Sequence, residues 1–321
     1  MYTHLTQWQR CLIFILKASN FSLRSIAKEI AVNVSTVSRE LSRNMFKEGY
    51  DPSYAELCYR KRRQDSKYLA YLWTPEIRAK VKHGLSQYCS PDQIVGALEK
   101  QGISINHETI YQYIWQDKKQ GGTLHRYLRR RGKKYKKRGS KYAGRGYIPG
   151  RVDIEERPKI VETKSRIGDW EGDTIIGAGR KGAIVTLVDR CSKIALFKKV
   201  ENNTSELVTK AVVEMLKPIK KQVHTITFDN GREFSGHQTI GRILKAKCYF
   251  AKPYHSWERG LNEHTNGLLR QFIPKKTNFK YVTDEDIAKY QNLINNRPRK
   301  ILNYNTPIEV FTSIQTVALR N

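Results

Sequence analysis

The sequence predicts a multi-domain protein in which all-α modules precede an α/β domain. The length of 321 residues is sufficient for two or three domains, each with a core of its own. Capped helical patterns dominate the first part of the chain, and strands alternating with helices follow from about residue 165. A basic, glycine-rich stretch separates the two patterns. We therefore expect helical domains over 1–68 and 69–125, a linker over 126–160 and an α/β domain over 161–321.

The net charge indicates a polyanionic partner. Lys and Arg outnumber Asp and Glu by 59 to 30, which gives a formal charge of +29 and a pI near 9.9. Nucleic acid is the commonest partner of so basic a protein, and a solvated basic surface with no specific partner is the alternative. Five scattered cysteines without C-x-x-C spacing favour a reducing compartment and no zinc site. No signal peptide or membrane-spanning run is recognisable, so we expect a cytoplasmic protein with no membrane contact.

The first 44 residues read as a helix-turn-helix preceded by one further helix. Thr6 and Ser22 are expected to cap the first two helices, because Ser and Thr are preferred N-cap residues. Asn33 is expected to adopt a left-handed turn, and Ser35 to cap the third helix. The alternative is a plain helical hairpin. The third helix offers side chains that suit phosphate contacts and base reading in a major groove, namely Ser35, Thr36, Ser38, Arg39, Ser42 and Arg43.

A second helix-turn-helix is predicted over residues 90–116. Ser90 and Gln93 form a capping box around a proline at the first helical position, and Gly102 ends that helix. A further helix then begins at HETIYQYIWQ. The candidate DNA-contacting residues of this helix and its cap are Asn106, His107, Thr109 and Gln112.

Residues 126–151 carry twelve Lys or Arg and no Asp or Glu, and five glycines interrupt them. Such a stretch usually becomes ordered only against a phosphate backbone. A solubilising tether is the alternative. The residues expected to contact phosphate are Arg130, Arg131, Lys133, Lys134, Lys136 and Lys137.

From about residue 165 the predicted order is β-β-β-α-β-α-β-α. The strings GDWEGDTIIG, AIVTLVD and KIALFKKV supply the first three strands, and HTITFD and KCYFA the last two. This order is typical of a ribonuclease-H-like fold, in which parallel strands extend an antiparallel hairpin and helices cover both faces.

Three acidic residues in this domain are candidates for metal-dependent phosphodiester chemistry. Asp173 lies within the first strand, and Asp229 ends the strand TITFD, where open α/β sheets place their sites. Glu263 follows on a late helix after 33 intervening residues. Carboxylates of this kind hold two Mg²⁺ or Mn²⁺ ions in two-metal cleavage. Such a spacing also arises by chance among 30 acidic residues.

Helix geometry adds to the case for Glu263. At 100° per residue, an apolar stripe of Leu261, Thr265, Leu268 and Phe272 lies opposite a polar one. The alternative is a solvated helix face with an ordinary ion pair. We expect Glu263, and not Glu258, to be the third acid. The polar stripe, which suits a metal and a phosphate together, comprises Arg259, Glu263, Asn266 and Arg270.

Long strings of the sequence carry a family resemblance. The helical modules contain IAKEIAVNVSTVSRELSRN and SPDQIVGALEKQGISINHETIY. The α/β domain contains TFDNGREF and PYHSWERGLNEHTNGLLRQFIPK, and the chain ends with LINNRPRKILNYNTPIEVF. Over nearly its whole length, the chain resembles the bacterial DDE transposases of the insertion-sequence-thirty family.

The resemblance implies an activity and its partners. It implies that Asp173, Asp229 and Glu263 are the three catalytic acids, and that the N-terminal modules bind the terminal inverted repeats of the element. It also implies a copy-out, paste-in route in bacteria. We expect double-stranded DNA, as repeats and as target, and further copies of the chain as partners, in a dimer or larger oligomer. The alternatives are a phage or retroviral-type integrase, a nuclease, or a DNA-binding regulator whose acid triad has decayed.

Overall fold

The chain divides into two compact units, and each is described by itself. The predicted boundary at residue 68 falls inside a helix, and the second helical module belongs to the same unit as the α/β domain. The units are Met1–Arg78 and Ala79–Asn321. The computed structural model describes residues 4–46, 49–71, 73–129, 148–252 and 260–318.

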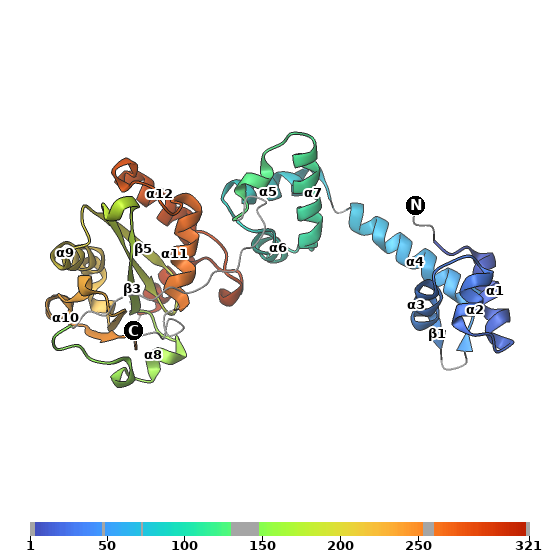
Figure 1. Cartoon of the computed structure of the whole chain (residues 1–321), viewed down its shortest axis with the longest axis horizontal. Helices are drawn as coiled ribbons and strands as arrows, with labels where there is room; N and C mark the ends of the chain where they lie inside the picture. Colours follow the sequence, from blue (N-terminus) through green and yellow to red (C-terminus); the bar gives the residue numbers. More distant parts are fainter. Residues whose placement is uncertain (1–3, 47–48, 72, 130–147, 253–259, 319–321) are drawn as a thin grey trace. The chain divides into compact units, whose positions relative to one another are not determined.

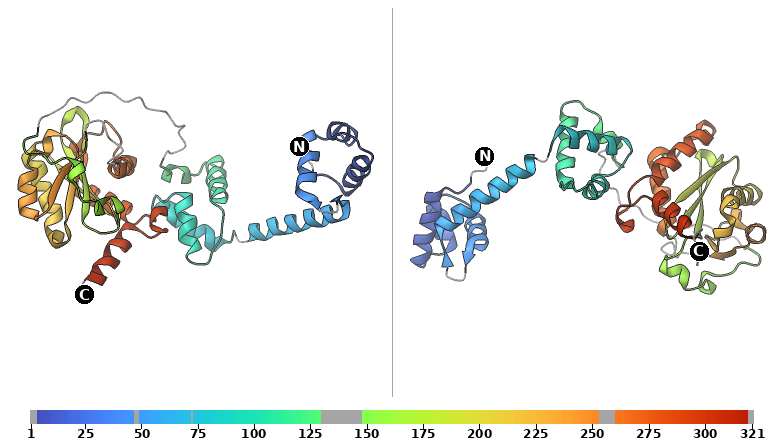
Figure 2. Two further views of the ribbon diagram at one scale, coloured as in Figure 1. Left: turned by 90° about the horizontal axis from the view of Figure 1, so that it is seen from below. Right: turned by 180° about the vertical axis from the view of Figure 1, so that it is seen from behind.

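The first unit is a small helical domain with an apolar core. Ile13, Ile26 and Val37 are fully buried in it, one from each of its first three helices. A long fourth helix, which was not predicted from the sequence, packs against the first (Figure 2). The elements are α1 (Gln7–Ala18), α2 (Leu23–Glu29), α3 (Val34–Asn44), the short strands β1 (Met45–Phe46) and β2 (Gly49–Tyr50), and α4 (Pro52–Tyr71).

The predicted caps of the first two helices are confirmed, and that of the third is wrong. The Thr6 side chain accepts a hydrogen bond from the Gln9 amide, in a capping box. The cap of α3 is Asn33, whose side chain accepts a hydrogen bond from the amide of Ser35. Asn33 has a φ of −71°, and the left-handed turn residue is Ala31, with a φ of 53°. An Asn oxygen satisfies an unpaired helical amide as well as a Ser oxygen does, so the helix begins two residues earlier.

The second helical module matches its predicted signals. Ser90 and Gln93 form the expected capping box, with Pro91 at the start of the helix. Gly102 follows the helix with a φ of +76°, a conformation that favours glycine. Asn106 caps the next helix by accepting from the Glu108 amide. The helices are α5 (Pro75–Ser86), α6 (Pro91–Glu99) and α7 (His107–Lys119).

The α/β domain has one five-stranded sheet with the predicted order of strands and helices. The spatial order is β5-β4-β3-β6-β7. The strands β3, β4 and β5 pair antiparallel, and β6 and β7 continue the sheet parallel to β3. The fold is therefore the predicted ribonuclease-H-like one. The strands are β3 (Asp169–Ile176), β4 (Ala183–Asp189), β5 (Ala195–Val200), β6 (Thr225–Phe228) and β7 (Lys247–Phe250).

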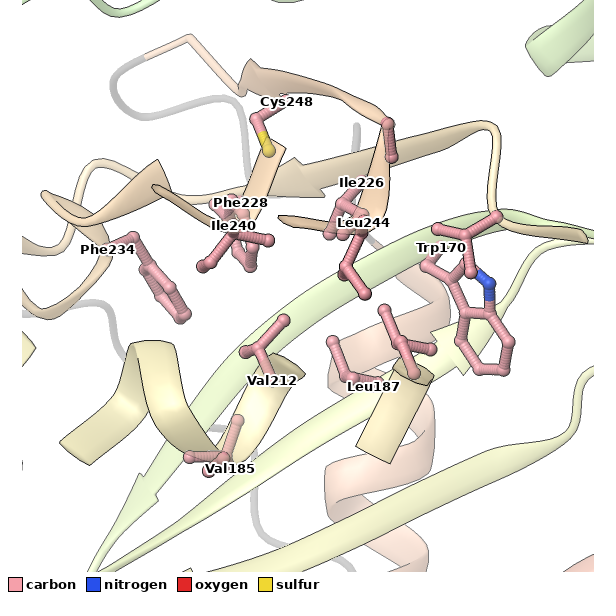
Figure 3. Packing of buried hydrophobic residues seen from close by; sticks show 14 of the residues in the cluster. Trp170, Val185, Leu187, Val212, Ile226, Phe228, Phe234, Ile240, Leu244 and Cys248 are labelled. Atoms are coloured by element: carbon pink, nitrogen blue, oxygen red, sulfur yellow. The ribbon is translucent and has the colours of Figure 1, made fainter. Parts of the chain in front are cut away.

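Helices cover both faces of this sheet (Figure 1). On one face, Phe228 and Ile226 of β6 pack with Leu244 in the larger apolar cluster (Figure 3). On the other face, Ile175 and Leu269 belong to a second cluster. The helices of the first face are α9 (Ser205–Leu216) and α10 (His237–Leu244), and those of the second are α11 (Gly260–Phe272) and α12 (Asp284–Asn295); α8 (Ile160–Thr163) and α13 (Pro307–Ala318) complete the described α-helices.

The last part of the predicted linker is attached to the α/β domain. Ile148 is 2% exposed in the larger cluster, and the Phe250 amide donates to the Val152 carbonyl at 2.9 Å. The end of the linker thus extends the β7 edge of the sheet. The six predicted phosphate-contacting residues between Arg130 and Lys137 lie outside the described residues, as do Glu258 and Arg259.

Candidate active site and nucleic-acid interface

The two candidate aspartates lie on neighbouring parallel strands, Asp173 within β3 and Asp229 directly after the end of β6. In the register of β3 and β6, Glu171 pairs with Thr227, and each aspartate follows its paired residue by two positions. Adjacent strands are about 4.8 Å apart, so this alignment brings the two residues close. A Cβ on Gly172 would lie 2.5 Å from the Phe228 ring, which belongs to the α9 and α10 side. Because side chains alternate along a strand, Asp173 lies on the opposite face, the one that α11 covers.

The helix α11 makes a direct contact with Asp173. Asn266 Nδ2 donates to Asp173 Oδ2 at 2.8 Å, and the Thr174 amide donates to Asp173 Oδ1 at 2.8 Å. Asn266 Oδ1 is buried and has no hydrogen-bond partner. Glu263 lies three residues before Asn266 and is exposed. Residues three apart share a helix face, so Glu263 and Asn266 lie on the same side of α11.

The structure brings Asp173 and Asn266 together, but the described side chains do not form a complete set of metal ligands. Within the described ranges, no three His, Cys, Asp or Glu side chains are arranged to hold a metal ion. Asp229 Oδ1 instead accepts from the Gly231 amide at 2.9 Å. The carboxylates therefore belong to one face of the sheet without converging on one point.

The packed stripe of α11 is rotated from its predicted position. Thr265 and Leu268 are buried as expected, but Leu261 and Phe272 are only half-buried. The buried Asn262 and Leu269 replace them. The reason is the polar contact with β3. The backbone amide of Asn262 donates to Glu171 Oε2 at 3.3 Å, and the Asn266 side chain donates to Asp173. The helix is thus fixed to the strand by hydrogen bonds as well as by apolar packing.

Arg270, predicted to hold phosphate, already has protein partners. Its Nη2 donates to the Ile176 carbonyl at 3.2 Å and its Nη1 to the Pro274 carbonyl at 3.3 Å. Burial lowers the pKa of Arg270. This arginine links the end of β3 to the end of α11 and so supports the contact region between them.

One acid near the aspartates, Glu233, was not predicted from the sequence. Thr174 Oγ1 donates to Glu233 Oε1 at 2.9 Å. A Cβ on Gly231 would lie 2.5 Å from Glu233 Oε2 and 2.9 Å from Asp229 Oδ1, so both carboxylates lie close to Gly231. The sequence contained a signal for this acid, because Glu233 lies only four residues after Asp229 in the same string, TFDNGREF.

Most of the predicted base-reading side chains of α3 are exposed. Ser35, Ser38, Arg39 and Arg43 are exposed, whereas Thr36 is half-buried. Arg39 Nη2 donates to Ser35 Oγ at 3.1 Å, which holds this guanidinium along the helix surface. The face that carries these residues is therefore open to a partner.

In the second predicted interface, at α7, some of the candidate DNA-contacting side chains already have structural roles. His107 and Gln112 are exposed, and Thr109 is half-buried. The Asn106 side-chain oxygen is the helix cap, so a DNA contact of Asn106 would use its amide nitrogen. In the described part of the chain, no helix is long and apolar enough to span a bilayer.

Two protein families match separate parts of the chain. A helix-turn-helix domain family matches residues 1–44, and an integrase core domain family matches residues 164–256. The first covers α1, α2 and α3, and the second covers the sheet with both candidate aspartates. Among solved structures, the catalytic core domain of BIV integrase is 16% identical, with a TM-score of 0.38, over 47% of this chain and 98% of that chain.

Named relatives match nearly the whole chain. The transposase for insertion sequence element IS4351 of Bacteroides fragilis is 49% identical over 98% of this chain and 97% of its own length. The transposase for IS1086 of Cupriavidus metallidurans is 33% identical over 98% of this chain and 95% of its own length. The transposase InsI for IS30A of Escherichia coli is 30% identical over 96% of this chain and 83% of its own length. The predicted resemblance is therefore confirmed, and the chain belongs to the family of insertion-sequence transposases.

Proposed function

We propose that this transposase binds the terminal inverted repeats of its own insertion sequence and cuts and rejoins DNA there with Asp173, Asp229 and Glu263. One observation carries the assignment of the acids. The hydrogen bond from Asn266 to Asp173 attaches the Glu263-bearing face of α11 to the strand that neighbours Asp229. The three acids thus come from three elements that meet at one face of the sheet.

The residues present suit divalent cations. All three acids offer carboxylate oxygens, the ligand type that Mg²⁺ and Mn²⁺ prefer. The unpartnered, buried Asn266 Oδ1 beside Asp173 is an acceptor that a cation or its hydration water would satisfy. Asp173, Asp229 and Glu263 would hold two such ions. When bound, the ions supply activation of the attacking oxygen and stabilisation of the leaving one.

The helical modules would deliver the DNA ends. The exposed Ser35, Ser38, Arg39 and Arg43 of α3 suit the major groove of a repeat, and His107 and Gln112 of α7 suit a second contact. The basic linker would neutralise phosphates on repeat or target DNA without reading sequence. Since an element has two ends to join, we include a homo-oligomer of at least two copies in the proposal.

The reaction we propose uses two displacements at phosphorus. Water cuts one strand at the element's end and leaves a 3′-OH, which then attacks a second phosphodiester directly. No side chain forms a covalent intermediate with DNA, so no Ser or Tyr nucleophile is required. A copy-out, paste-in sequence of these steps agrees with the family to which the chain belongs.

The test uses the purified full chain, Mg²⁺ and a duplex that carries the element's terminal repeat. Wild-type protein should nick at the repeat end and transfer the strand. Glu263→Gln should lower cleavage by more than about 100-fold, since loss of an outer-shell partner of a metal already costs 10–100-fold. Its affinity for the repeat should remain within about twofold of wild type, because metal ligation and repeat binding use different modules.

The matched control is Glu206→Gln, which removes another exposed glutamate from the first turn of a helix, α9, on the opposite face of the sheet. It should cleave at the wild-type rate. Repeat binding without any cleavage by wild-type protein would instead indicate a DNA-binding regulator. Cleavage that ignores the repeat would indicate a nuclease, and cleavage of viral ends alone an integrase.

A further inference from the structure

A cavity of about 740 Å³ adjoins the candidate acids on the α11 side of the sheet. Glu171 of β3 lines it, and so do Gly260 and His264 of α11. Glu171 lies two residues before Asp173, so both side chains are on the same face and about 6.6 Å apart along the strand. The cavity is therefore adjacent to the proposed active site along β3.

Two buried arginines in the cavity wall have incomplete hydrogen bonding. Arg157 is 7% exposed and Arg190 is 3% exposed. Arg190 Nη1 donates to Glu171 at 2.7 Å and Nη2 to Glu162 at 3.1 Å, while Arg157 bonds Glu162 and Thr227. The Nε of each arginine is buried without a partner. Glu162 is thus shared by both guanidiniums.

The rest of the wall adds further positive charge. Five Lys or Arg line the cavity against three Glu, and one of these, Glu155, is bound by Lys252 from outside the wall. Burial, together with the neighbouring charge of Lys164, lowers the pKa of Lys193. Like charges that face one another in a cavity favour an anionic ligand.

We propose that this cavity binds a backbone phosphate of the DNA strand that runs across Asp173 and Asp229. The assignment rests on the proposed function, because that function brings a DNA strand to the adjacent residues of β3. A phosphodiester offers unesterified oxygens to the exposed Lys164 and to the half-buried Lys193, whose Nζ also donates to the Arg190 carbonyl. The site would hold the DNA strand in place beside the acids, at a phosphate near the one that is cut.

The binding test needs no catalysis, so it separates the two proposals. The full chain is treated with an acetylating reagent in EDTA, with and without the repeat-end duplex, and each lysine is quantified by mass spectrometry. We expect the duplex to slow acetylation of Lys164 and Lys193 by at least about threefold. Lys245 is the internal control, because it is exposed and has the same left-handed backbone, with a φ of 56° against 54° and 64°. It lies at the end of α10 and does not line the cavity.

Each outcome supports or overturns the phosphate site. Protection of Lys164 and Lys193 but not of Lys245 supports the phosphate site even if wild-type protein fails to cut DNA. Unchanged reactivity of the two wall lysines overturns it. Equal protection of all three also overturns it, because it indicates an unspecific coat of DNA. Protection by 10 mM inorganic phosphate alone to the same extent would show a site for free phosphate and would also overturn the assignment to DNA.

A second measurement connects the cavity to the reaction. The double variant Lys164→Gln/Lys193→Gln should lose about tenfold in cleavage rate at subsaturating DNA, as expected when charge-assisted phosphate contacts are removed. A neutral methylphosphonate at the contacted phosphate should slow wild type similarly but should not slow the double variant further. The control Lys245→Gln/Lys247→Gln removes the same charge and should behave as wild type. Additive losses from the variant and the methylphosphonate at every position would contradict the proposal.

Discussion

Asn266 joins the candidate acids to the helix that carries Glu263. Its Nδ2 is bound to Asp173, and its Oδ1 is buried without a partner. An amide is suited to this position because it can donate to one carboxylate and still present an oxygen. Neither Ala nor Asp can do both.

The variant Asn266→Asp should therefore make the fold more dependent on a divalent cation. It sets a second carboxylate against Asp173, and two like charges at hydrogen-bond distance destabilise the metal-free protein. The Tm without metal should fall, and 10 mM Mg²⁺ should raise it more than it raises that of wild type. Asn292→Asp adds the same charge at an exposed position of α12 and should show no such gain. An equal Mg²⁺ response in both variants would contradict the metal assignment.

Tyr50 gives the first unit a pH dependence. Burial, followed by the charge of Glu40, raises the pKa of the Tyr50 hydroxyl above its usual 10. The folded chain therefore holds this proton more tightly than the unfolded chain does. The resulting stabilisation is complete below pH 10 and is lost as the pH rises above it.

Between pH 9 and 11, the melting transition of the first unit should consequently fall more steeply in wild type than in Tyr50→Phe. Circular dichroism of the full chain measures this. Tyr281→Phe, at a site that is 78% exposed, is the control and should follow wild type. Identical slopes for Tyr50→Phe and wild type would show that the buried hydroxyl does not titrate with unfolding.

At the level of elements, one buried arginine connects three helices of the first unit. Arg10 Nε of α1 donates to Glu40 of α3 at 2.8 Å, and its Nη1 donates to Glu56 of α4 at 2.7 Å. The Arg10 side chain is 3% exposed. The orientation of α3, the proposed recognition helix, thus depends on the buried charge of Arg10 in α1.

Arg10→Gln should cost the first unit about 3–5 kcal/mol, because it leaves the buried Glu40 without its cation and leaves Glu56 only the solvent-exposed Arg60. Repeat binding should weaken accordingly, although no DNA contact is removed. The control, Arg60→Gln, breaks the ion pair to Glu56 from the solvent side and should cost at most about 1 kcal/mol. Thermal melting and a mobility-shift titration report the two effects. A stable Arg10→Gln protein with normal binding would refute this role.

The same elements show how far the sequence could be interpreted. Ser90 and Gln93 determine the start of α6 through contacts within one turn, so the sequence pattern alone was enough to predict where that helix begins. The start of α3 was misplaced because Asn33 and Ser35 are both good caps and only the folded backbone selects one. The helix α12 was missed, although Thr283 opens it with a capping box.

The candidate acids could be proposed from the sequence to the extent that they depend on local pattern. Asp173 lies in a recognisable strand, and Asp229 directly follows one. The hydrogen bond of Arg190 with Glu171 joins the turn after β4 to β3, and that of Asn262 with Glu171 spans 91 positions. No periodicity in one segment encodes such contacts, so the cavity beside the acids could not be anticipated. The buried stripe of α11 was rotated for the same reason.

For the whole molecule, charge should control affinity more than sequence preference. Changing Lys133, Lys134, Lys136 and Lys137 to Ala should flatten the dependence of repeat binding on salt, by about 0.9 in log–log slope for each phosphate that is no longer neutralised. The preferred sequence should not change, because lysines bound to phosphate carry no base information. Mobility shifts at several salt concentrations, with repeat and scrambled duplexes, measure both properties.

The control for that experiment removes four exposed lysines from the α9 and α10 side, Lys210, Lys217, Lys221 and Lys245. It has the same net charge as the linker variant and should keep the wild-type slope. If both variants flatten the slope equally, the linker acts only through total charge and is a tether.

The contact between α6 and Tyr304 limits how such an element can evolve. A Cβ on Gly96 would lie 2.2–2.4 Å from the Tyr304 ring, so any other residue there requires a change at position 304. We therefore expect residues 96 and 304 to change together among related transposases. Transfer of the second helical module alone into a relative should succeed only when residue 304 is transferred with it.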